Sequence, residues 1–110
     1  MMDRPLYLNQ LSRAVRRSPI TALVGPRQCG KTTLAHIFAK DKSVSLFDLE
    51  SQLDLNRLQN PQLMLSSLRG LVIIDEIQVM PDLFRLLRVL IDRPENKARF
   101  LILQCIARPD

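Results

Sequence analysis

Short apolar runs alternate with amphipathic segments along this chain. Four of the runs have the length of strands, and they lie at Ile20–Val24, Val44–Leu49, Leu71–Ile74 and Phe100–Leu103. The third run contains no polar residue, which is typical of a strand covered on both faces. We therefore predict four strands, and we expect the third of them to be buried.

The segments between these runs have apolar residues at helical spacing. Leu8, Leu11 and Val15 share one face of a first helix, which Pro19 closes. We predict further helices over about residues 31–40, 53–58 and 61–68. A last helix should start near Pro81, with a buried stripe of Leu83, Leu87, Leu90 and Ile91. Alternating strands and helices indicate an α/β fold with a mainly parallel sheet.

The composition is that of one ordinary globular domain. The 110 residues allow a single small domain, and the hydrophobic share of 46% is normal for such a domain. Without an apolar run near the ~20 residues that a membrane span needs, and without a signal-peptide core, we expect a cytoplasmic protein with no membrane partner. Two isolated cysteines, Cys29 and Cys105, and a single histidine, His36, argue against zinc or histidine chemistry.

The net charge of +5 would permit contact with nucleic acid. Arg13, Arg16, Arg17, Arg85 and Arg88 could contribute to such a surface. Aromatic residues make up only 5% of the chain and no long basic run is present, so solvated helix faces explain the excess more simply. A basic nucleic-acid-binding module is the alternative function that this charge keeps open.

A glycine-rich segment, GPRQCGKT, joins the first predicted strand to the following helix. It matches the pattern GxxxxGK[ST] in the strand–loop–helix setting that the pattern requires. The glycines let the main chain approach a ligand closely, and consecutive N–H groups at a helix N-terminus attract anions. We predict that nine residues bind nucleotide phosphates: Gly25, Pro26, Arg27, Gln28, Cys29, Gly30, Lys31, Thr32 and Thr33.

Several residues of this segment have specific predicted roles. Lys31 supplies positive charge to the β- and γ-phosphates, and Thr32 offers a hydroxyl to Mg²⁺, which prefers oxygen ligands. Thr33 could reach the α-phosphate. A plain glycine-rich turn would explain the glycines but not a lysine at position 31. Cys29 lies near the helix N-terminus, where a thiol can become oxidisable, although a spacer is the simpler interpretation.

Two carboxylates, Asp75 and Glu76, follow the apolar run at Leu71–Ile74. Ligands of open α/β sheets lie outside the carboxyl ends of the strands, so this pair should reach the same edge as the glycine-rich segment. Asp75 can hold Mg²⁺, and Glu76 can polarise an attacking water. We therefore predict ATP and Mg²⁺ as cofactors, Thr32 and Asp75 as metal-binding residues, and Glu76 and Lys31 as catalytic residues. The alternative is a solvated turn after a core strand.

The runs LVGPRQCGKTTLA, SLFDLE and LVIIDEIQVMPDLF resemble the AAA+ superfamily of P-loop ATPases. They are most similar to predicted prokaryotic ATPases that join an amino-terminal AAA domain to a carboxyl-terminal domain of unknown function. The resemblance covers nearly the whole chain. It implies Walker A roles for Lys31 and Thr32, Walker B roles for Asp75 and Glu76, and a three-layer P-loop fold. The strand at 20–24 would lie beside that at 100–103, followed by 71–74 and then by 44–49 at one edge.

The resemblance also implies elements beyond these four strands. The family continues with a fifth strand, a helical lid and arginine fingers, so we expect residues 1–110 to be the N-terminal part of one AAA domain, with weak or lost hydrolysis. The unpaired edge of the first strand leaves a homo-oligomer open. After Leu103 the chain reads QCIARPD, which a frameshift in a family-typical GSASPDL would produce, and we hypothesise such a frameshift. Cys105 then lies near the position of a small polar sensor residue.

A P-loop kinase or GTPase is a further alternative. The sequence has no NKxD-type guanine reader and no arginine-rich lid, and both absences favour an ATPase. Gln78 belongs to the DEIQ run, but no role for it follows from the sequence. Tyr7 could lie near an adenine, although we expect it in the core. His36 is expected to be an exposed or satisfied helix residue.

Overall fold

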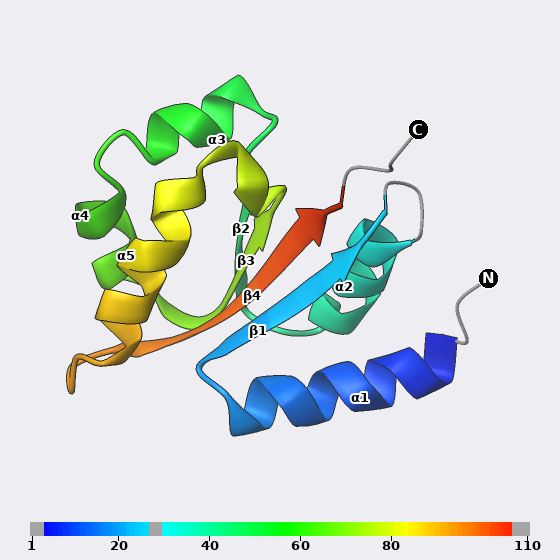
Figure 1. Ribbon diagram of the computed structural model, residues 1–110. Coiled ribbons are helices and arrows are strands. Elements are labelled where there is room, and N and C mark those ends of the chain that lie inside the picture. The colour runs from blue at the N-terminus through cyan, green and yellow to red at the C-terminus, as the bar shows by residue number, and fades with distance from the viewer. Residues whose placement is uncertain (1–3, 27–29, 107–110) are drawn as a thin grey trace.

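The computed structural model describes residues 4–26 and 30–106 (Figure 1). In chain order the elements are α1 (Arg4–Arg17), β1 (Ile20–Gly25), α2 (Lys31–Ala39), β2 (Val44–Asp48), α3 (Gln52–Arg57), α4 (Pro61–Ser66), β3 (Arg69–Asp75), the 3₁₀ helix η1 (Ile77–Val79), α5 (Pro81–Ile91) and β4 (Lys97–Cys105). Every predicted strand and helix is present. None of the helices described is long and apolar enough to cross a lipid bilayer.

All four strands run parallel in one sheet of order β1-β4-β3-β2. β4 lies between β1 and β3, with Phe100 opposite Ile20 on one side and Val72 on the other. The α/β fold class and the strand order that the resemblance implies are therefore confirmed. Because parallel strands share one direction, their carboxyl ends all lie at the same edge of the sheet.

Helices cover both faces of the sheet and give three layers (Figure 1). α1 and α2 lie on one face, and α3, α4 and α5 lie on the other. Successive side chains of β3 alternate between the two cores: Val72 and Ile74 pack with the α5 layer, whereas Leu71 and Ile73 pack with α1 and α2. Both sets are buried, and this explains the uninterrupted apolar run in the sequence.

Two features differ from the predicted elements. β4 extends from Lys97 to Cys105, well beyond the apolar run at 100–103, because its main-chain pairing with β3 and β1 continues past both ends of that run. The short helix η1 has no counterpart among the predicted elements. It follows directly after Glu76, whose backbone is left-handed.

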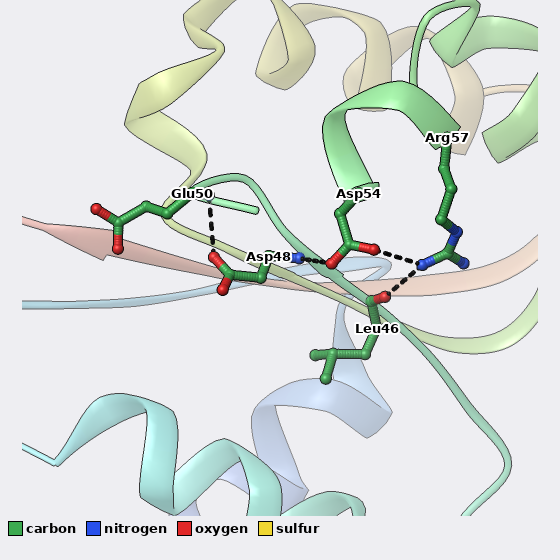
Figure 2. Close-up of polar contacts among 5 residues, drawn as sticks. All are labelled: Leu46, Asp48, Glu50, Asp54 and Arg57. Atoms are coloured by element: carbon green, nitrogen blue, oxygen red, sulfur yellow. Dashed lines mark hydrogen bonds and ion pairs between the residues drawn. The ribbon is translucent and has the colours of Figure 1, made fainter. Parts of the chain in front are cut away.

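Two side chains of α3, Asp54 and Arg57, cover the outer edge of β2, and we call them the edge clamp (Figure 2). Main-chain groups of Leu46 and Asp48 face away from β3, since alternate residues of a strand bond to the same side. Arg57 Nη1 donates to the Leu46 carbonyl (3.0 Å), and the Asp48 N–H donates to Asp54 Oδ2 (2.8 Å). The clamp thus occupies polar groups that would otherwise be open to an additional strand.

The edge clamp is itself held together by charge. Arg57 Nη1 donates to Asp54 Oδ1 (3.0 Å), and the guanidinium carbon lies 4.1 Å from the centre of the buried Phe47 ring. The hydrogen bond from Asp48 lowers the pKa of Asp54; partial burial opposes this effect and Arg57 adds to it. Just beyond, Asp48 Oδ1 accepts a bond from the Glu50 N–H (3.0 Å), which sets the path of the chain after β2.

Replacing Asp54 by asparagine should lower the free energy of unfolding by about 1 kcal/mol at pH 7, because the Asp48 N–H loses a charged acceptor. A carboxylate whose pKa is lowered by folding stabilises the protein above the pKa of the unfolded chain, about 4. That contribution is lost as the pH falls further, through the folded pKa. Urea denaturation of wild type and Asp54→Asn at pH 7 and pH 3 measures the difference.

Gln52→Ala is the matched control for this experiment. Gln52 lies on the exposed side of the same helix, where its amide donates to Asn56 Oδ1 (3.0 Å) and touches no edge of the sheet. We expect this variant to show no change in pH dependence. A gap between wild type and Asp54→Asn that is equally large at both pH values would contradict the role given to the charge of Asp54.

Candidate functional site

Segments that follow three of the strands, together with the last residue of β4, enclose one polar cavity of about 410 Å³ at the carboxyl edge of the sheet. α2 is the next element after β1, β2 is followed by the turn before α3, and β3 ends at Asp75, next to Glu76. The cavity lining combines cationic, hydroxyl, carboxylate and thiol groups: Gly30, Lys31, Thr32, Thr33, Asp48, Glu50, Asp75, Glu76 and Cys105.

The start of α2 provides main-chain donors to this cavity. Gly30 is the residue before the helix and has φ 93° and ψ 10°, a left-handed conformation that glycine adopts without steric cost. The first N–H groups of a helix have no acceptor within it, so they attract anions. Of the predicted phosphate-binding residues, Arg27, Gln28 and Cys29 lie outside the described residues. The interpretation of Cys29 as a spacer therefore stays a prediction. Gly25 and Pro26 lead into the turn.

Lys31 is buried at the bottom of the cavity, with 4% of its surface exposed. Its Nζ donates to the Pro26 carbonyl (3.1 Å) and to Cys105 Sγ (3.2 Å). Neither of these partners carries a formal charge. A buried ammonium group is costly unless an anion is near, so this lysine favours a negatively charged ligand in the cavity.

Thr32 and Asp75 meet across the cavity, although they are 43 residues apart in sequence. Thr32 Oγ1 donates to Asp75 Oδ2 (3.0 Å). The other carboxylate oxygen, Oδ1, is buried and has no hydrogen-bond partner in the described structure. Burial raises the pKa of Asp75, and the carboxylates of Glu76 and Asp48 add to this, while the bond from Thr32 opposes it. A buried carboxylate oxygen that accepts no hydrogen bond is suited to binding a cation.

Glu76 is 6% exposed and lies in a strained backbone conformation, with φ 61° and ψ 47°. For a residue with a side chain, this left-handed region costs on the order of 1 kcal/mol or more and is found mainly at functional sites. Glu76 Oε1 accepts a bond from Cys105 Sγ (2.9 Å), and Oε2 accepts one from Gln78 Nε2 (2.8 Å). The carboxylate is therefore held at the carboxyl end of β4.

Cys105 bridges the lysine and the glutamate of the cavity. Its thiol donates to Glu76 and accepts from Lys31. Burial raises the pKa of Cys105, and the bond to Glu76 acts in the same direction, while Lys31 opposes both. The side chain is therefore a neutral thiol that can donate one hydrogen bond and accept another.

Two cavity residues, Asp48 and Glu50, were not predicted from the sequence as part of the site, and they line the cavity from the end of β2. Gln78 does not line the cavity, but it contacts both Glu76 and the end of β4, and no role was predicted for it. The sequence nevertheless indicated Asp48 and Glu50 as site residues, because both lie in the run SLFDLE at the carboxyl end of a predicted strand, where ligands of such sheets bind.

The expectations for Tyr7 and His36 have different outcomes. His36 is exposed on α2, as predicted. Tyr7 is 39% exposed and is not a core residue, so the expectation of core packing is wrong.

Comparisons with known proteins agree with this architecture. A protein-family model described as an AAA domain matches residues 17–104, which include nearly all of the sheet. An uncharacterised protein of Mycobacterium tuberculosis and one of Mycobacterium bovis are each 52% identical to this chain over 110 residues. Each match covers the whole chain and 25% of the relative, so the chain spans about a quarter of the length of these proteins. The chain therefore belongs to the AAA domain family and is a nucleotide-binding module of the AAA type.

Proposed function

We propose that the cavity binds ATP with Mg²⁺ and that Glu76 promotes hydrolysis of the bound nucleotide, slowly in this chain. The observation that carries the proposal is the placement of a buried ammonium group, Lys31, at the start of a helix, beside the hydrogen bond from Thr32 to the buried Asp75. Cationic, hydroxyl and carboxylate groups in this arrangement complement a polyphosphate and its counterion.

The phosphates would be bound by Lys31 and by the main-chain N–H groups at the start of α2. The contacts of Lys31 Nζ with the Pro26 carbonyl and with Cys105 Sγ are weak compared with a bond to a phosphate oxygen. A triphosphate would replace these two partners of the Lys31 ammonium group. It would supply the negative charge that the Pro26 carbonyl and the Cys105 thiol lack. Thr33, which also lines the cavity, would lie next to the α-phosphate.

The residues present fit a magnesium ion that arrives with the nucleotide. No group of three or more His, Cys, Asp and Glu residues within 4–26 and 30–106 is arranged to hold a metal by itself. Mg²⁺ in phosphate-transfer sites needs only one or two protein ligands, because phosphate and water oxygens complete its shell. Thr32 and the unpartnered oxygen of Asp75 would hold it, and the ion would neutralise charge on the phosphates.

Glu76 would act on the water that attacks the γ-phosphate. Its carboxylate is buried, lines the same cavity as Lys31 and accepts bonds from Gln78 and Cys105. As the water oxygen forms its bond to phosphorus and the bond to ADP breaks, Glu76 would orient the water and accept its proton. We also propose that residues 1–110 are the N-terminal part of one ATPase domain.

The nucleic-acid alternative is less well supported by the arrangement of charge. Arg13, Arg16 and Arg17 are exposed on α1, whereas Arg85 and Arg88 are exposed on α5. The two helices lie on opposite faces of the sheet (Figure 1). A polyanion would need a continuous basic surface, and these arginines do not form one.

Lys31→Ala should weaken ATP binding in the presence of Mg²⁺ at least about tenfold, as expected for the loss of a charge-assisted bond to phosphate. Titration calorimetry with ATP measures the affinity. Lys42→Ala is the matched control, because Lys42 is an exposed lysine just beyond the same helix whose Nζ contacts the Phe38 carbonyl (2.9 Å). Equal affinities for wild type and Lys31→Ala would refute the phosphate site.

Asp75→Asn should abolish the gain in ATP affinity that Mg²⁺ gives to the wild type, because an amide is a much poorer magnesium ligand than a carboxylate. The measurement compares ATP affinity with Mg²⁺ and with EDTA in both proteins. Asp92→Asn, at the exposed end of α5, serves as the control. If Asp75→Asn retained the full response to Mg²⁺, the metal would have to be held elsewhere.

A further inference from the structure

Gln78 links the ends of two strands through its side-chain amide. Nε2 donates to Glu76 Oε2 (2.8 Å), and Oε1 accepts from the Cys105 N–H (3.2 Å). The polarity of this bridge is fixed by chemistry. With the amide turned over, its oxygen would face a carboxylate and its NH₂ group would face an N–H, so both contacts would become repulsive.

The local backbone does not need this side chain to keep its shape. η1 is closed by main-chain bonds from Val79 N–H to the Glu76 carbonyl (3.0 Å) and from Met80 N–H to the Ile77 carbonyl (3.0 Å). Ile77 anchors it in the core with 4% exposure, whereas Gln78 is only half-buried. The amide is therefore not required as a structural support for η1, and its two bonds act on the Glu76 carboxylate and on the end of β4.

The bond that Glu76 accepts from Cys105 depends on Lys31. Cys105 Sγ donates to Glu76 Oε1 and accepts from Lys31 Nζ. Once a phosphate takes the lysine, the thiol loses that partner and becomes free to reorient. The bond from Gln78 involves neither Lys31 nor the thiol, so it persists through this change.

We propose that Gln78 is a positioning residue that keeps the Glu76 carboxylate at the end of β4, facing the cavity, when Lys31 leaves Cys105 for the nucleotide. This inference rests on the function proposed above for Glu76. It assigns a role to Gln78 of the DEIQ run, for which no role followed from the sequence. Gln78 acts through Glu76 and does not touch the phosphates.

Gln78→Met and Gln78→Glu test this role in the full chain. Methionine has a similar length without hydrogen-bonding groups, and glutamate keeps the shape but places a second carboxylate against Glu76. We expect single-turnover hydrolysis of ATP to fall at least about tenfold in both, as for misplacement of a general base. The affinity for ATP with Mg²⁺ should change less than about twofold, because the groups proposed to bind the phosphates and the metal are unchanged. Hydrogen exchange at the Cys105 N–H should be faster in Gln78→Met, which lacks its acceptor.

Gln52→Met is the control, since Gln52 is an exposed glutamine that bonds to Asn56 on α3. It should hydrolyse ATP like the wild type. Wild-type hydrolysis in Gln78→Met would overturn the inference, and so would a loss of ATP affinity as large as the loss of rate, which indicates a general structural role. If wild type were no faster than Glu76→Gln, the catalytic role of Glu76 and this inference would both fail. ATP binding, tested separately with Lys31→Ala, would still stand.

Discussion

Parallel pairing of β1, β4, β3 and β2 is the constraint on which the rest of this molecule depends. It places the carboxyl ends of four strands at one edge, so that groups from distant parts of the chain share one cavity. The pairing is stabilised by two cores, one on each face, because every residue of β3 from Leu71 to Ile74 is buried. The apolar content of the two central strands thus determines that Lys31 and Asp75 line the same cavity. If one of these strands ran in the opposite direction, its carboxyl end would lie at the other edge of the sheet, away from this cavity.

Several features of the cavity are unfavourable for the free energy of folding, and the two cores offset their cost. Lys31, Asp75 and Glu76 are the buried charged residues of the described structure, and Glu76 also has a left-handed backbone. An unpartnered oxygen of Asp75 adds a further cost. A polyanion would compensate the buried charge of Lys31, and a divalent cation would bind the open oxygen of Asp75. The left-handed backbone of Glu76 and the unpartnered oxygen of Asp75 occur in neighbouring residues at this cavity, and such features are expected at a binding site.

The sequence predicted the strands, the helices and the cavity edge because these depend on local patterns: apolar runs, helical spacing, and a glycine-rich turn between a strand and a helix. It did not predict contacts that depend on tertiary placement. Asp54 and Arg57 resemble an ordinary surface pair three residues apart, and only the position of α3 beside β2 turns them into the edge clamp. Gln78 likewise has no signature of its own. Its role depends on the left-handed turn at Glu76, which no propensity indicates.

The two sides of the cavity are braced in a similar way, by side chains from the short helical segment that follows each strand. On one side, the edge clamp of α3 fixes the end of β2 and with it the turn that carries Asp48 and Glu50. On the other side, Gln78 of η1 fixes Glu76 against β4. Both braces use charge-assisted bonds to main-chain or carboxylate groups, which hold position more firmly than apolar packing at a solvent-exposed edge. Lys31 lies between them and is bonded to a carbonyl and a thiol, both of which it can leave. The described part of the cavity therefore combines fixed carboxylates with the ammonium group of Lys31, which can turn toward a ligand.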